Sequence, residues 1–135
     1  MPTYSTVTGF DFSGAAKICD AVSPKLYTMH WSLMVKFWAA PILAANPQLS
    51  EESVVRSLVR IMEIDDDGTG GGSVSDYGYP APDEPHPIAS GPQSRKLRDV
   101  AGEVAGECAV TPLVHGYGPL NDFKRRLQLV ADCDA

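Results

Sequence analysis

Three side chains that could carry acid–base or polar-ligand chemistry each end a short apolar run of the sequence. They are Asp11, His30 and His115, at the ends of residues 7–11, 25–30 and 110–115. A helical pattern follows each run, as expected for a strand that leads into a helix. In parallel α/β folds, ligands bind at the carboxyl ends of the strands. We therefore predict that these three candidate catalytic residues meet at one edge of a sheet.

The chemistry expected of these residues follows from their ionisation. An imidazole titrates near neutral pH, so His30 and His115 could contact a substrate or shuttle a proton. The structural alternatives are a buried imidazole at 30 and a histidine at 115 that hydrogen-bonds its own turn. Asp11 could act as a general base or nucleophile, or could cap the helix that follows it. No second carboxylate is paired with it by spacing.

Aromatic side chains stand close to both histidines. Tyr27 and Trp31 flank His30, and Tyr117 follows His115 in a Gly-Tyr-Gly-Pro turn. Aromatic surfaces beside polar groups suit a flat polar ligand such as a sugar ring. We predict Tyr27, Trp31 and Tyr117 as substrate-binding residues, although core packing of the aromatic rings is the simpler explanation.

No segment predicts a metal or a cofactor. The acids at 65–67 lack the alternating spacing of a calcium loop, and no lysine-serine pair follows the glycines at 70–72. Residues 83–86 include metal-capable types, but their proline-rich setting indicates a surface loop. A metal shared by Asp11, His30 and His115 stays a minor alternative, because His-x-His and His-Glu-x-x-His spacings are absent. No nucleophile elbow supports a covalent hydrolase triad.

The elements that must position these residues alternate between strands and helices. The predicted order is β-α-β-α-α-loop-α-β-α, with helices that begin near residues 13, 32, 50, 94 and 119. Pro41 is expected to bend or end the second helix. Residues 65–92, rich in glycine and proline, form a long loop. The alternation predicts an α/β fold with a parallel sheet.

Composition describes one domain over residues 1–135, with 44% hydrophobic and 21% charged residues. The net charge of −6 argues against nucleic acid as a partner. The basic residues at 95–96 and 124–126 are interpreted as solvated helix faces. Three cysteines without metal-ligand spacing indicate reduced thiols and a cytoplasmic protein. No apolar stretch is long enough for a membrane span.

Three segments carry a resemblance to a known family: residues 8–15, 25–31 and 113–119. They resemble part of a group of bacterial (β/α)8-barrel proteins that are similar to glycoside hydrolases. The resemblance implies a TIM-barrel fold and a sugar-like ligand at the top of the barrel, but no segment matches an acid/base pair. Because a complete barrel takes about 250 residues, the chain is expected to be an incomplete barrel fragment. A small open three-layer α/β sandwich is the alternative.

We expect the chain to be a fragment of a glycosidase-like barrel protein with little or no activity alone. If it is an enzyme, we expect a hydrolase. Its partner would be a sugar-like small molecule, with no nucleic acid, no membrane and no cofactor. Open sheet edges would allow self-association. The rival hypotheses are a non-catalytic interaction domain that uses the 65–92 loop and a degenerate product without selected activity.

Overall fold

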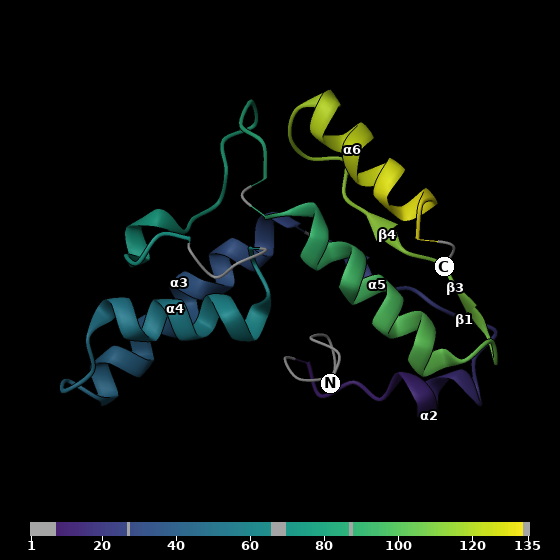
Figure 1. Ribbon diagram of the computed structural model, residues 1–135, viewed down its shortest axis with the longest axis horizontal. Coiled ribbons are helices and arrows are strands. Elements are labelled where there is room, and N and C mark those ends of the chain that lie inside the picture. Colours follow the sequence, from purple (N-terminus) through teal and green to yellow (C-terminus); the bar gives the residue numbers. More distant parts are fainter. Residues whose placement is uncertain (1–7, 27, 66–69, 87, 134–135) are drawn as a thin grey trace.

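The chain folds into a mixed α/β structure with short parallel strands and larger helices (Figure 1). The computed structural model describes residues 8–26, 28–65, 70–86 and 88–133. Its elements are α2 (Phe12–Ala16), β1 (Ala21–Val22), β2 (Lys25–Leu26), α3 (Thr28–Ala45), α4 (Glu51–Met62), the 3-10 helix η1 (Val74–Asp76), α5 (Ser90–Val104), β3 (Ala109–Val110), β4 (Leu113–Val114) and α6 (Leu120–Ala131). Within the described residues the sheets are open and form no barrel.

The strands form two parallel pairs, β1 with β3 and β2 with β4. Both pairs have the same register, so each residue of 21–26 faces the one 88 positions later, as Ser23 faces Thr111. The paired segments are a short repeat, Ala-Val-Ser-Pro-Lys-Leu and Ala-Val-Thr-Pro-Leu-Val. Pro24 lacks the N–H that would continue the ladder, which explains the gap between the two pairs.

Helices cover one face of this sheet. Val22 and Leu26 are buried beneath them, whereas Ala21 and Lys25, on the other face, are exposed. α5 lies between α2 and α6 and contacts both (Figure 1). The core therefore lies between the helices and the even-numbered strand residues.

α4 is the helix that its sequence predicts most directly. The Ser50 side chain accepts a hydrogen bond from the N–H of Ser53 at 3.2 Å, and Glu51 and Glu52 occupy the first turn. Both features favour a helix start, by capping and by charge against the helix dipole. Its apolar face packs against α3, and the two helices lie side by side in Figure 1.

The strand predicted over residues 25–30 is too long. β2 ends at Leu26. α3 begins at Thr28 and includes His30. Trp31, Val35 and Ala39 are buried at a spacing of four residues, which is the period of a helix face and not of a strand. Pro41 lies inside α3 without ending it. None of the helices in the described residues is long and apolar enough to cross a bilayer.

The strand predicted over residues 7–11 is also wrong within the described residues. Val7 lies outside the described residues, residues 9–11 have no strand structure, and Asp11 is the N-cap of α2. Its carboxylate accepts a hydrogen bond from the N–H of Gly14 at 2.8 Å, so the capping alternative is confirmed. α2 is short and ends at Ala16.

The last two predicted helices are present with shifted starts. α5 begins at Ser90 and has Pro92 in its first turn, where a missing N–H costs no helical hydrogen bond. α6 begins after Pro119, which is its N-cap and not part of its first turn. The predicted third strand is confirmed in part, as β3 and β4 on either side of Pro112.

Close packing against side chains explains part of the glycine run in the 65–92 loop. A Cβ on Gly70 would lie 2.6 Å from a carboxylate oxygen of Asp65 and 2.8 Å from the hydroxyl of Tyr77. The Tyr77 hydroxyl donates to the carbonyl of Gly71 at 2.9 Å. The glycines thus let this part of the loop fold tightly and lead into η1.

Candidate ligand-binding site

The described loop residues bring a third aromatic side chain to two of the predicted site residues. Tyr79 lies between His30 of α3 and Tyr117 of the β4–α6 turn, with ring centroids 6.0 and 5.2 Å away. His115 follows β4 directly, and its ring centroid is 6.4 Å from that of Tyr117. We call His30, Tyr79, Tyr117 and His115 the aromatic cluster. It lies at the carboxyl end of the strand pair, where His115 directly follows β4, whereas His30 reaches it from α3 and not from a strand end.

The other predicted site residues do not join this cluster. Asp11 caps α2, which lies at the opposite end of the molecule from the β4–α6 turn (Figure 1). Trp31 is only 6% exposed, and its ring packs under the ammonium of Lys96, 3.9 Å from the ring centroid. A ligand therefore cannot reach the Trp31 ring. Tyr27 lies outside the described residues.

A buried polar network connects the segments that carry the aromatic cluster. Arg126, fully buried in α6, donates to Asp122 and, at 2.8 Å, to Nδ1 of His86. It also donates to the carbonyls of His115 at 3.2 Å and Tyr117 at 2.8 Å. One guanidinium thus ties the 65–92 loop, the β4–α6 turn and α6 together. Because Arg126 is buried, the prediction of a solvated face at 124–126 is wrong for it.

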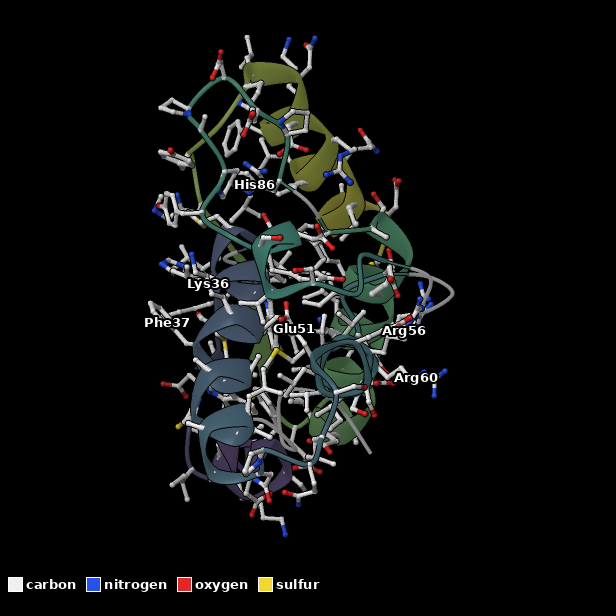
Figure 2. The ribbon with its side chains drawn as sticks, turned by 90° about the vertical axis from the view of Figure 1, so that its left-hand side faces the viewer. Lys36, Phe37, Glu51, Arg56, Arg60 and His86 are labelled. Atoms are coloured by element: carbon white, nitrogen blue, oxygen red, sulfur yellow. The ribbon has the colours of Figure 1, made fainter. Side chains whose placement is uncertain are left out.

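His86 is held in its neutral form by this environment. Burial, and then the positive charge of Arg126, lower its pKa to about 4. Nδ1 accepts from Arg126 and also contacts the Thr28 hydroxyl, so the ring proton belongs on Nε2. Nε2 is buried and has no hydrogen-bond partner in the described residues. Figure 2 shows His86 between its loop and α6.

Asp122 is the anion of the network. Burial acts to raise its pKa, but hydrogen bonds from Arg125 and from the His86 N–H, with the charges of both arginines, outweigh burial and lower the pKa. Arg125 donates to Oδ1 at 2.6 Å, while the His86 N–H donates to Oδ2 at 3.2 Å. Asp122 therefore remains a carboxylate and is a structural anion, not a proton donor.

The second basic pair behaves in the same way. Lys96 is fully buried in α5, and its ammonium donates to the carbonyls of Met62 at 2.7 Å and Glu63 at 3.1 Å. These bonds cap the carboxyl end of α4, where carbonyls lack helical partners. Burial lowers the pKa of Lys96 to about 7. The prediction of a solvated face at 95–96 is wrong for Lys96.

A hollow with a mixed polar and apolar lining adjoins the aromatic cluster at Tyr79. It has a volume of about 430 Å³ and is lined by Asp76, Gly78, Tyr79, Pro80, Glu84 and Pro85. The Tyr117 hydroxyl donates to the carbonyl of Pro80 at 3.0 Å, which fixes the ring beside this segment. Burial, then the neighbouring Tyr79 and the carboxylates of Asp83 and Glu84, raise the pKa of Tyr117, so its hydroxyl stays protonated.

Chemically, the site offers ring faces, the exposed imidazole of His30, the half-buried imidazole of His115 and carboxylates beside a hollow. No group of three or more His, Cys, Asp or Glu within the described residues could hold a metal ion. Sequence reasoning missed Tyr79 and the Asp122–Arg126 pair, and its assignment of residues 83–86 to a surface loop is wrong for His86, which is 4% exposed. The i, i+4 spacing of that pair on a helix was the available signal, whereas nothing in the sequence indicates that His86 is buried.

The comparisons with known proteins leave the site to be interpreted from its geometry. Neither a protein-family model, nor a curated protein, nor a solved structure matches the chain.

Proposed function

We propose that the aromatic cluster and the adjoining hollow bind a carbohydrate-type ligand. The main supporting observation is a row of four neighbouring rings beside a hollow that is lined by Asp76 and Glu84. The rings are those of His30, Tyr79, Tyr117 and His115. A sugar presents an apolar C–H face to a ring and hydroxyl donors at its edge. Ring faces and carboxylate acceptors complement these two surfaces.

The more specific part of the proposal is that the chain has a barrel-type architecture. It is supported by parallel strand segments that each lead into a helix, with helices over one face of the sheet. In such folds ligands bind at the carboxyl ends of the strands, where His115 lies. The chain would then be a fragment of a glycoside-hydrolase-like barrel protein.

Binding, and not hydrolysis, is the activity proposed for this chain. Glycoside hydrolysis requires two carboxyl groups with different protonation states across the scissile bond. Asp11 is remote from the cluster, and Asp122 is neutralised by two arginines. The carboxylates of Asp76 and Glu84, which line the hollow, each accept a hydrogen bond from a backbone N–H of their own loop. The rival hypothesis, recognition by the 65–92 loop, predicts binding at the same surface, because Tyr79 belongs to that loop.

The test is titration of the ¹⁵N-labelled protein with neutral mono- and oligosaccharides, followed by NMR chemical shifts. We expect saturable shifts around residues 78–84 and 115–118, and a loss of at least tenfold in affinity for Tyr79→Ala. Tyr79 is 48% exposed, so its removal should leave the fold intact. Phe37→Ala is the matched control, because Phe37 is an exposed ring that projects from α3 elsewhere (Figure 2).

Two outcomes would contradict the proposal. Absence of saturable shifts with any sugar would remove the ligand class. Equal losses for Tyr79→Ala and Phe37→Ala would show that the ligand does not bind at the cluster. Aryl glycosides added to the wild-type protein test the hydrolase alternative separately, since release of the aryl group would establish turnover.

A further inference from the structure

The negative charge of the protein is concentrated in the 65–92 loop. Residues 65–92 contain six Asp and Glu residues and no Lys or Arg. The rest of the chain has equal numbers of acidic and basic residues, 11 of each, so the loop accounts for the whole net charge of −6. The one histidine of the loop, His86, is neutral at pH 7 because its pKa is lowered to about 4. The loop therefore has no cation of its own to balance its acids.

Two carboxylates of this loop line the hollow without a countercharge. Asp76 and Glu84 stand there beside the exposed ring of Tyr79, and neither forms an ion pair with another residue that the structure describes. Each accepts one backbone N–H, Asp76 from Ser73 at 3.0 Å and Glu84 from Ala81 at 3.1 Å. Because a carboxylate offers about four acceptor sites, both can accept further hydrogen bonds.

The rings beside the hollow lie within the negative potential of these acids. Burial is the largest cause of the raised pKa of Tyr117, and the neighbouring Tyr79, Asp83 and Glu84 add to it. A cleft whose walls carry charges of one sign concentrates ions of the opposite sign. The face of a tyrosine ring also attracts a cation. The two kinds of lining therefore favour the same ligand charge, which is positive.

We propose that the carbohydrate ligand of this site is an amino sugar, whose ammonium donates to the carboxylates of Asp76 and Glu84 while its ring packs on Tyr79. This inference rests on the proposed function, because the rings must bind the sugar that carries the amine. An ammonium has three donors and no acceptor, so it satisfies the remaining acceptor sites and balances their charge. A neutral sugar supplies the donors but leaves the carboxylates without a countercharge.

Two sugars that differ in one group test this preference. The β-1,4-linked disaccharides of glucosamine and of glucose are identical except for an ammonium in place of a hydroxyl at carbon 2. In NMR titrations of the wild-type protein at low salt and at a pH that keeps the amine protonated, we expect the glucosamine disaccharide to bind about tenfold more tightly. The difference should shrink in about 0.5 M sodium chloride, because salt screens exposed charges.

One charge-removing substitution locates the preference at the hollow. Glu84→Gln keeps an oxygen that can accept from the N–H of Ala81, and Glu84 is exposed, so the fold should be unchanged. We expect this variant to lose most of the preference for the ammonium and to bind the glucose disaccharide within about twofold of the wild-type affinity. Glu107→Gln is the matched control, because it removes the same charge from an exposed residue beyond the carboxyl end of α5. It should keep the preference.

The outcomes separate this inference from the proposed function. Saturable binding of both disaccharides with equal affinity would overturn the amino-sugar inference and leave the proposed function standing. Equal losses of the preference in Glu84→Gln and Glu107→Gln would overturn it as well, since the preference would then reflect the net charge of the protein. Methylammonium chloride provides the last comparison. If it binds at residues 78–84 as tightly as the glucosamine disaccharide, the sugar ring contributes nothing, and both proposals fail.

Discussion

The buried guanidinium of Arg126 should contribute far more to stability than that of its neighbour Arg125. Both pair with Asp122, but the Arg126 side chain is 0% exposed and the Arg125 side chain 38%. Removal of one partner from a buried ion pair costs about 3–5 kcal/mol, whereas exposed pairs contribute about 0–1 kcal/mol. The comparison thus contrasts a buried and a partly exposed arginine that pair with the same carboxylate.

The expected loss for Arg126→Met follows from its contacts. The variant removes donors to Asp122, His86 and the carbonyls of His115 and Tyr117. Methionine keeps apolar contact, and Arg125 still neutralises Asp122, so we expect a loss of about 2–4 kcal/mol in the free energy of unfolding. Arg125→Met should lose less than about 1 kcal/mol.

Urea unfolding at pH 7, followed by circular dichroism, measures both variants. The midpoints are comparable only if the slopes agree with that of the wild-type protein. Asp122→Asn and the double variant Asp122→Asn/Arg126→Met complete a double-mutant cycle that isolates the pair. If Arg126→Met and Arg125→Met have equal effects, the buried network does not hold the loop and α6 together as argued.

Three further predictions concern buried titratable groups and one glycine. Because the pKa of His86 is lowered to about 4, the fold prefers the neutral ring; stability should be complete above about pH 6.5 and fall by roughly 3 kcal/mol as the pH drops through 4. Urea midpoints that stay flat over that range would refute this. The pKa of Lys96 is lowered to about 7. Between pH 7 and about 10.5 the amine is neutral in the folded protein but still protonated in the unfolded chain, so the free energy of unfolding should rise with pH over that range. Lys96→Met should remove the rise, and an unchanged rise in the variant would assign it to another group. Gly118→Ala should lose about 1–3 kcal/mol in urea unfolding, because φ is +96° and a Cβ would lie 2.8 Å from Nε2 of His86. Gly102→Ala, in α5 with open space around it, should gain about 0.5–1 kcal/mol, and equal effects of the two would refute the conformational argument.

Local signals in the sequence predict the helices well. Ser50 with two acids in the first turn defines the start of α4, and the apolar spacing defines its buried face. The parallel strand at 110–115 and the placement of His115 at its end were also predictable. These features depend on neighbours within a few residues, which is why a single sequence reveals them.

Features that depend on distant contacts were not predictable. His30 was placed at a strand end because residues 25–31 form one apolar run, and period alone does not distinguish a short buried strand from a buried helix. Lys96 and Arg126 look like surface charges, since the backbone carbonyls to which they donate lie on other elements or in turns. Burial of a long cation becomes visible only when those partners are assembled.

The site itself arises where the two repeated strands stop being alike. After 21–26 the chain enters α3 almost at once, whereas after 109–114 it forms an extended turn before α6. With the offset of 88, the counterpart of His30 is Gly118, whose positive φ and missing Cβ let the His86 ring approach. A second helix start at that position would occupy the place of the ring. The divergence after the repeat therefore creates the opening into which the 65–92 loop inserts His86 and beside which it presents Tyr79.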